Sequence, residues 1–413
     1  MTLLPRRRVV LVFLAFAFAY FLSALIRAIT ATLAPTLTLE LGLQASDLGL
    51  LAGGYFLGFA VMQLPLGTWL DRHGPKTVIL CFLSAAVLGC AAFAMATGFS
   101  GLLAARLLCG AGLSACLMAP LTGYRRWFDV AVQMRANSWM LMTGSLGMLA
   151  STLPVQWLVP VLGWRALFWC LAALVLLSMM LIVWLVPRWA TALPADPADP
   201  AVAGSAPVPS GYAAVWRHPY FRRLVPLGFF SYGGMIAMQT LWAGPWMVKV
   251  AGFSALEAAT GLFWINMAML GTFWAWGLLN PWMAKRGLGP DRLMAWGLPS
   301  SMLALVLIVA SGASAGNGTP LLWIFFCMGS SFITLSQPAL ALAFPPELAG
   351  RALSAFNLVI FAGVFAVQWG VGLGVDAFRA SGLTEVAAFQ SAMGLFLVTC
   401  LVSYGWFLLK ARH

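Results

Sequence analysis

Charged residues are scarce in this sequence. They make up 8% of the 413 residues, whereas soluble domains contain about 25%. Acidic residues are the scarcest, with 11 Asp and Glu against 23 Lys and Arg, and only three histidines occur. Hydrophobic residues make up 62% of the chain, and the mean hydropathy is +0.93. This composition excludes an ordinary soluble domain and indicates an integral membrane protein.

Acidic residues are absent from the interiors of the long apolar runs. All eleven fall in loops, in a linker or at the ends of runs: Glu40, Asp47, Asp71, Asp129, Asp196, Asp199, Glu257, Asp291, Glu347, Asp376 and Glu385. No carboxylate or histidine is therefore placed to relay protons inside the membrane. We find no nucleophile with a base, no metal-ligand spacing and no phosphate-binding loop. The sequence argues against an enzyme, and it predicts no cofactor and no metal site.

The apolar runs predict an all-α membrane protein with twelve transmembrane helices, because about 20 residues cross the hydrocarbon core. The runs lie near residues 9–34, 48–70, 77–97, 101–122, 137–160, 165–186, 224–248, 257–280, 293–312, 321–343, 353–375 and 387–408. Of the 23 Lys and Arg, 18 fall on one side of this arrangement. Since cytoplasmic loops carry the basic residues, both termini are predicted to be cytoplasmic. The same bias explains the net charge of +12, so nucleic-acid binding is not predicted.

Residues 187–220 are the one break in composition, rich in Pro, Ala, Gly and Ser. Such a composition is typical of a flexible linker. It divides the chain into a six-helix bundle at residues 1–186 and a second at residues 221–413. Polar or bulky residues recur at the same spacing in the first and seventh spans, which indicates an internal repeat of the two halves.

The loop between the second and third spans carries a charged motif, Gly67, Asp71, Arg72, Gly74 and Lys76, in the order Gly-x-x-x-Asp-Arg-x-Gly-Pro-Lys. On a helix, Gly67 and Asp71 lie on one face, so a neighbouring backbone is expected to approach closely there. Gly74 is expected to turn the chain.

This motif resembles the signature between spans 2 and 3 of the major facilitator superfamily of transporters. The stretch from Arg106 to Gly112, with spaced glycines, is similar to that family's span 4 motif. The resemblance implies two six-helix bundles that alternate access to a central site. It also implies that Asp71 acts as a latch against the positive N-terminal end of span 11, near Arg351. The Gly-Pro pair in span 5 that marks many drug antiporters is absent.

Two arginines lie within predicted spans, Arg27 and Arg106. An arginine at the centre of a span costs about 2.5–3.5 kcal/mol on insertion scales, so each needs a compensating partner. One interpretation is a paired positive site for an anionic group in the outer half. The other is snorkelling or hydrogen bonding between helices.

Other candidate binding residues share faces with these arginines or repeat their positions. Tyr20 and Ser23 precede Arg27 at helical spacing, so all three face one direction. The equivalent face of span 7 adds Tyr232, Gln239 and Trp242 to the predicted substrate-binding set. Two amides in later spans, Asn266 and Asn357, complete this set. Buried amides and aromatic residues also serve simply to pack helices.

The leading functional hypothesis is a secondary active transporter of a small anionic organic solute, working by alternating access. One alternative is export of hydrophobic or cationic compounds. Another is copper import, because Met235, Met238, Met267 and Met269 cluster in spans 7 and 8. We expect a monomer in the lipid bilayer of the plasma membrane, the inner membrane of a bacterium. Its predicted partner is a small-molecule substrate, with symport of a coupling ion left open.

Overall fold

The structure is a computed structural model that describes residues 4–187 and 212–410. Within these residues every regular element is helical, and no strand occurs. Most of the predicted linker, residues 188–211, lies outside the described residues. The predicted all-α class is therefore confirmed for the part of the chain that the structure describes.

The residues before the linker form seven helical elements, several of them interrupted by turns. They are α1 (Arg6–Leu41), α2 (Ala45–Val61), α3 (Gln63–Met95), α4 (Phe99–Leu113), α5 (Ala115–Trp127), α6 (Val130–Ala150) and α7 (Leu153–Leu185). The predicted turn at Gly74 is present inside α3, and a second turn lies at Gly163 inside α7. Both glycines have positive φ, 74° and 76°, a conformation that other residues rarely adopt.

The residues after the linker form the remaining elements. They are α8 (Tyr212–Arg217), α9 (Pro219–Pro226), η1 (Leu227–Tyr232), α10 (Gly233–Ala237), η2 (Met238–Trp242), α11 (Ala243–Lys249), α12 (Ala255–Lys285), α13 (Pro290–Ser311), η3 (Gly312–Gly318), α14 (Thr319–Ser330), η4 (Ser331–Leu335), α15 (Ser336–Leu342), α16 (Pro346–Ala380) and α17 (Glu385–Leu409). The elements η1 and η2 are wide π-helical turns, which are frequent at functional sites.

Nine helical stretches in the described residues are long and apolar enough to cross a membrane. Two of them, Ala45–Met95 and Pro290–Leu342, contain 51 and 53 residues. Each of these two is long enough for two crossings, because one takes about 20 residues. They turn back at Gly74 and at Gly312–Gly318. The count of twelve spans stays a prediction.

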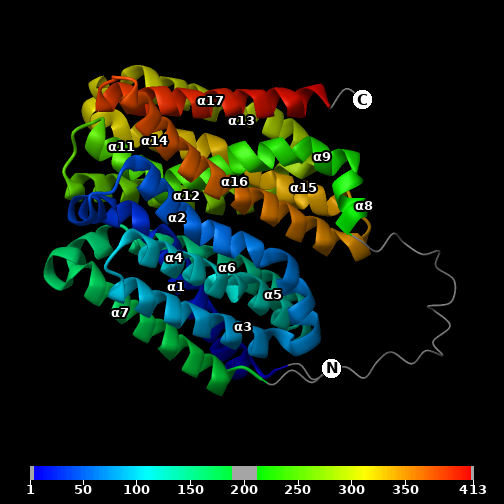
Figure 1. The fold of residues 1–413 in the computed structure, drawn as a ribbon. Helices are drawn as coiled ribbons and strands as arrows, with labels where there is room; N and C mark the ends of the chain where they lie inside the picture. Colours follow the sequence, from blue (N-terminus) through cyan, green and yellow to red (C-terminus); the bar gives the residue numbers. More distant parts are fainter. Residues whose placement is uncertain (1–3, 188–211, 411–413) are drawn as a thin grey trace.

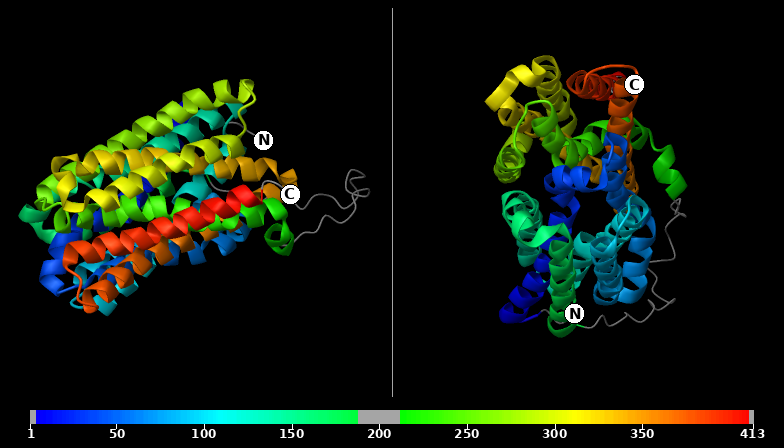
Figure 2. Two further views of the ribbon diagram at one scale, coloured as in Figure 1. Left: turned by 90° about the horizontal axis from the view of Figure 1, so that it is seen from above. Right: turned by 60° about the vertical axis from the view of Figure 1, so that its left-hand side comes forward.

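The helices form two groups that lie side by side, α1–α7 and α8–α17 (Figure 1). The chain leaves the first group and enters the second at one end of the molecule, where both termini also lie; we call it the linker end. The opposite end, the far end, carries the turns at Gly42, Gly98, Gly252 and Gly382. From above, the helices of both groups run along one common direction (Figure 2).

Helices α2 and α16 pack against each other along the boundary between the two groups. Their backbones touch at two glycines, because a Cβ at Gly49 would overlap the carbonyl oxygen of Gln368 and one at Gly372 would overlap that of Ala45. Small residues allow such close approach of helices in membranes. This contact closes the two groups together toward the far end.

Glycine also sets the packing inside the first group. A Cβ at Gly110 on α4 would overlap the backbone carbonyl of Tyr55 on α2. Backbone atoms cannot move aside as a flexible side chain would, so α4 lies against α2 only because residue 110 has no side chain.

We therefore expect Gly110→Ala to destabilise the protein by about 1–3 kcal/mol, the usual cost of overpacking. Thermal unfolding of the purified protein in detergent measures this as a lower melting temperature. Gly271→Ala on α12 is the matched control, because nothing lies within 4 Å of a Cβ there. Equal melting temperatures for the two variants would contradict the packing argument.

Candidate functional site

Arg27 lies on α1 at the boundary between the two groups of helices. Helix α1 packs against η2 and α11 of the second group, and the Arg27 side chain is half-buried. Its Nε is buried without a hydrogen-bond partner among the described residues. The phenols of Tyr55 and Tyr232 lie within electrostatic range of its guanidinium. Arg27 is thus a half-buried cation with an unused buried donor and, among the described residues, no carboxylate partner.

Tyr20 and Tyr232 bring aromatic hydroxyls from the two groups toward this arginine. Tyr20 is buried on α1, and its ring packs over Gly144 of α6, where a Cβ would come within 2.6 Å of a ring carbon. Tyr232 ends η1, and the two phenols lie within electrostatic range of each other. Tyr232 of the second group therefore lies near Tyr20 and Arg27 of the first group. Their role in binding stays a prediction.

Arg106 lies close to Arg27 but is enclosed by helices. Its side chain is fully buried, and its Nη1 donates a hydrogen bond to the carbonyl of Ile26 at 2.9 Å. Its guanidinium also lies over the ring of Tyr55, 5.0 Å from the centroid. Nε and Nη2 have no partner in the described part of the chain. The contacts that Arg106 makes tie α4 to α1 at the residue beside Arg27, and its direct contact with a solute stays a prediction.

Ser23, predicted on the same face as Arg27, makes its contacts within the first group. Its hydroxyl donates to the carbonyl of Leu113 at 3.3 Å, and its own carbonyl accepts from the Tyr55 hydroxyl at 3.4 Å. The serine therefore joins α1 to α2 and α4. A buried hydroxyl needs such a partner. Because the Ser23 hydroxyl already donates to Leu113, its proton is not available to a substrate.

The predicted residues Gln239, Trp242 and Asn266 form hydrogen bonds within the second group. Gln239 Nε2 donates to Asn266 Oδ1 at 3.0 Å, and the Asn266 amide donates to the Leu262 carbonyl at 2.9 Å. The fully buried Trp242 donates from Nε1 to the carbonyl of Gln368 at 3.1 Å. These bonds join η2 to α12 and α16. They hold the wide turns of span 7 in place beside Arg27.

Asn357 lies on α16 and takes part in another contact of this kind. Its Oδ1 accepts from Gln337 Nε2 at 2.8 Å. This bond joins α16 to α15, away from the residues around Arg27. Sequence reasoning recognised Asn357 as a buried amide but had no means of placing it relative to the other candidates.

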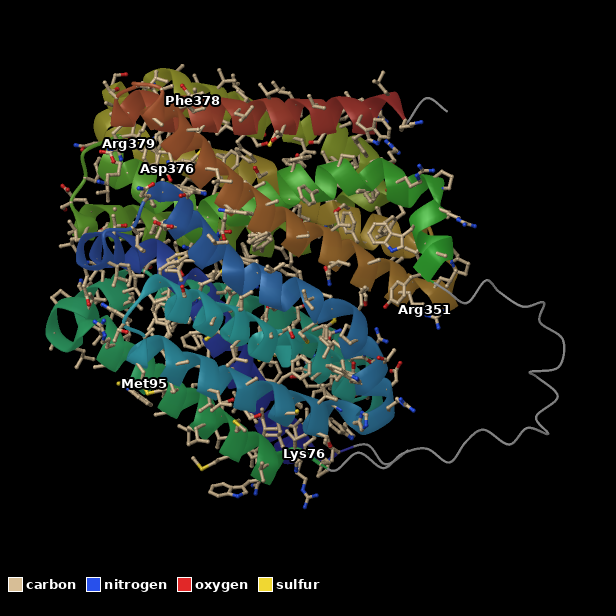
Figure 3. The ribbon with its side chains drawn as sticks, in the orientation of Figure 1. Lys76, Met95, Arg351, Asp376, Phe378 and Arg379 are labelled. Carbon is tan, nitrogen blue, oxygen red and sulfur yellow. The ribbon has the colours of Figure 1, made fainter. Side chains whose placement is uncertain are left out.

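The far end contains a contact between the two groups that sequence reasoning missed. Asp376, on the last turns of α16, accepts hydrogen bonds from the backbone N–H groups of Ala45 and Ser46 at 3.2 and 2.8 Å (Figure 3). These are the first residues of α2, so the carboxylate caps a helix N-terminus, where negative charge is stabilised. The only signal in the sequence was an acid near the end of span 11, which does not reveal that α2 begins beside it.

The equivalent contact at the linker end is not made in this conformation. Asp71 is exposed, and within the described residues it has no hydrogen bond or ion pair. The close backbone approach predicted at Gly67 is wrong for this conformation, because nothing lies within 4 Å of a Cβ there. The reason is that α16, the expected neighbour, meets the first group mainly through α2, nearer the far end.

The remaining motif residues are placed as follows. Lys76 Nζ donates to the carbonyls of Val183 and Val186 at 2.7 and 2.6 Å, so it caps the C-terminal end of α7. Arg72 is exposed on α3. Arg351 is exposed on α16, in electrostatic range of Tyr212. Figure 3 shows Lys76 and Arg351 toward the linker end, on different groups.

Comparison with known proteins identifies the family. The chain matches the Major Facilitator Superfamily over residues 16–368. It is 24% identical over 411 residues to the 4-hydroxybenzoate transporter PcaK of Pseudomonas aeruginosa, covering 94% of this chain and 84% of that one. It is 29% identical over 147 residues to the hexuronate transporter of Escherichia coli, covering 36% of this chain and 34% of that one.

A solved structure shares the fold over nearly the whole chain. The crystal structure of a bacterial homologue of the human lysosomal transporter Spinster, in an inward-facing and unoccupied conformation, superposes with a TM-score of 0.80. It is 17% identical and covers 99% of this chain and 98% of that chain. The family match covers most of the sequence, and the resemblance of the charged motif is thereby confirmed: this protein belongs to the Major Facilitator Superfamily.

Proposed function

We propose that this protein is a secondary transporter that moves a small organic anion across the membrane by alternating access. The observation that carries the proposal is Arg27, a cation held between the two groups of helices with a buried Nε that has no hydrogen-bond partner among the described residues. A charge inside a membrane protein is costly unless it is compensated. A carboxylate or sulfonate on the solute supplies that compensation.

The names of related proteins support an anionic solute. 4-Hydroxybenzoate and hexuronates both carry a carboxylate. They differ in everything else, since one is aromatic and the others are sugar acids. The carboxylate is therefore the feature for which a shared binding group is expected, and a guanidinium is the side chain that grips it bidentately.

We assign the site residues different tasks. Arg27 binds the anionic group, and the hydroxyls of Tyr20 and Tyr232 donate hydrogen bonds from the two groups of helices. Arg106 holds the backbone of α1 at Ile26, which fixes the position of the neighbouring Arg27. The bonds of Gln239 and Trp242 keep span 7 in register against α12 and α16.

Alternating access then requires that span 2 and α16 separate at one end of the molecule while they stay in contact at the other. At the far end Asp376 of α16 holds the N-terminus of α2. Asp71 lies at the linker end, just after span 2, and is exposed. Within the described residues it has no hydrogen bond or ion pair with the N-terminus of α16 in this conformation. We propose that the transporter opens one end at a time by exchanging these two contacts between an acid and a helix N-terminus.

The setting proposed for this cycle is the inner membrane of a bacterium, with both termini and the linker in the cytoplasm. The bias of basic residues supports this orientation. Residues 1–186 and 221–413 act as the two moving bundles of a monomer, and coupling to an ion by symport is proposed to drive uptake.

Replacing Arg27 tests the anion site. Arg27→Lys keeps the charge but loses the planar fork, so affinity for 4-hydroxybenzoate should fall. Arg27→Gln removes the charge, and affinity should fall by at least about tenfold, since hydrogen bonds to charged groups contribute about 1.5–3 kcal/mol. Calorimetry in detergent and uptake into proteoliposomes measure the two effects.

Arg135→Gln, an exposed arginine on α6, is the matched control and should bind normally. If a screen of organic acids, drugs and metal ions finds a cation or a neutral lipophile as substrate, the anion site is wrong. Normal transport by Arg27→Gln would lead to the same conclusion, and Arg27 would then be a structural residue.

Replacing Asp376 tests the contact at the far end. Asp376→Asn removes a charged acceptor of two backbone hydrogen bonds, so we expect the far end to open more often. Spin labels at Leu39 and Leu256, both exposed near that end and on different groups, should report a larger share of long distances. Glu385→Gln is the control, because within the described part of the chain Glu385 forms ion pairs with Lys249 and Arg379, both of its own group. An unchanged distance distribution would disprove the contact's role.

Replacing Asp71 tests the other end. Within the described residues the side chain has no hydrogen bond or ion pair, so Asp71→Asn should leave solute affinity near that of the wild type while transport falls. Asp71→Glu retains the charge and should transport better than Asp71→Asn. A parallel loss of affinity and transport in Asp71→Asn would instead indicate misfolding or direct binding.

A further inference from the structure

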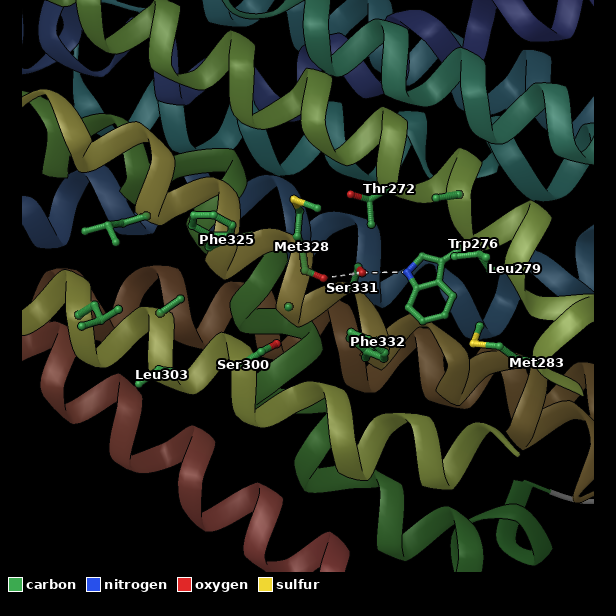
Figure 4. Close-up of a pocket in the computed structure, with 15 residues that line it drawn as sticks. Thr272, Trp276, Leu279, Met283, Ser300, Leu303, Phe325, Met328, Ser331 and Phe332 are labelled. Carbon is green, nitrogen blue, oxygen red and sulfur yellow. Dashed lines mark hydrogen bonds between the residues drawn. The ribbon is translucent and has the colours of Figure 1, made fainter. Parts of the chain in front are cut away.

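An apolar groove runs along the outer side of the second group, between α12, α13 and α14 (Figure 4). Its volume is about 550 Å³, within the range of about 300–1,000 Å³ typical of small-molecule sites. Leu279, Leu303, Leu307 and Phe325 on its walls are 47%, 61%, 48% and 54% exposed. Because these helices cross the membrane, the groove opens toward lipid and not toward the boundary between the two groups.

The polar atoms in the groove wall are already occupied. Trp276 Nε1 donates to Ser331 Oγ at 2.8 Å, and that hydroxyl donates to the carbonyl of Met328. Thr272 and Ser300 donate to carbonyls of their own helices at 2.8 and 2.6 Å. No side-chain donor in the wall is left for a polar ligand, so the groove suits a hydrocarbon chain.

The walls of the groove lead to positive charge at the linker end. On α12 the lining residues Trp276, Leu279 and Met283 follow one helical stripe. Arg286 lies in the turn directly after α12, three residues beyond Met283. On α13 the stripe of Leu303 and Ser300 continues through Trp296 to Arg292 at intervals of three to four residues. Both walls therefore end in an arginine at the same end of the membrane.

These arginines are exposed and are not neutralised by nearby acids. Arg286 lies over the ring of Trp282 and Arg292 over that of Trp296, at 3.9 and 4.5 Å from the centroids. Neither pairs with a carboxylate in the described part of the chain. The adjacent Asp291 is engaged by Arg223 at 2.6 Å and by Tyr220. Lys285, also exposed, adds a third positive charge to the mouth.

We propose that this groove is a binding site for an anionic phospholipid of the bilayer. An acyl chain lies between α12, α13 and α14, and the phosphate is held by Arg286 and Arg292 at the mouth. Arginines flanked by tryptophans suit the membrane interface, where Trp and Arg anchor at headgroup level. The site is separate from the solute site around Arg27, because it lies wholly within the second group.

Two measurements on the full-length protein in detergent test the proposal. Native mass spectrometry compares retention of phosphatidylglycerol with that of phosphatidylcholine. We expect a preference for phosphatidylglycerol that falls on the order of tenfold in the double variant Arg286→Gln and Arg292→Gln. The matched control, Arg6→Gln with Arg8→Gln, removes two exposed arginines at the same end and should keep the preference.

The second measurement locates the chain. A phosphatidylglycerol with a photoreactive group in its acyl chain should crosslink to α12 and α14, around Met283 and Met328. Ala275→Phe fills the groove and should reduce this crosslinking, whereas Leu278→Phe, which does not line the groove, should not.

Three results would overturn the proposal. The first is equal retention of both lipids, which would mean a groove that takes any hydrocarbon. The second is crosslinking spread evenly over the lipid-facing helices. The third is a dimer in the native spectrum that Ala275→Phe abolishes, which would mean that a second copy of this chain covers the groove.

Discussion

The capture of the N-terminus of α2 by Asp376 is the contact on which the present conformation depends. It joins a negative charge to the first two backbone N–H groups of a helix from the other group. Charged hydrogen bonds of this kind contribute about 1.5–3 kcal/mol each. Most other interactions across the boundary, such as the stacking of Phe56 and Phe59 against Phe361, lack direction and tolerate rocking. The carboxylate therefore defines which end of the boundary is held.

The proposed solute site is arranged around that boundary. Arg27 stands where α1 meets the wide turns of span 7, and Arg106 fixes the backbone next to it. The two arginines differ in burial. Arg106 is fully buried and donates from Nη1 to the carbonyl of Ile26, although its Nε and Nη2 have no partner among the described residues. Arg27 is half-buried at the boundary between the two groups. In the second group Gln239 donates to Asn266, Asn266 donates to the carbonyl of Leu262, and Trp242 donates to the carbonyl of Gln368.

Much of the fold was predictable from the sequence, because membrane spans have a strong local signal. Apolar runs predicted the helices, and Gly74 was correctly assigned to a turn. Partners were harder to predict. That Ser23 donates to Leu113, or that Asp376 meets Ala45, depends on which helices are neighbours, and that information lies in tertiary packing and not in periodicity.

Sequence reasoning also found a motif where the structure has no contact. The pattern around Asp71 predicted a close approach at Gly67, yet this conformation leaves the space open. The residues of a motif can be needed in any conformation of the protein, whereas one structure shows a single conformation. A residue with a role in another conformation therefore makes no bond here. The lipid-facing groove is the opposite case, because three helices form it in the structure although no local sequence pattern predicts it.

The glycines between α2 and α16 have a mechanical consequence. At Gly49 and Gly372 backbone meets backbone, so the helices carry no interlocking side chains at those two points. One helix can rotate against the other at such a contact, because the rotation requires no change of side-chain rotamer and opens no cavity. Resistance to motion is then concentrated in a few polar contacts at the ends. The protein can thus be stiff along each bundle and compliant between the two bundles.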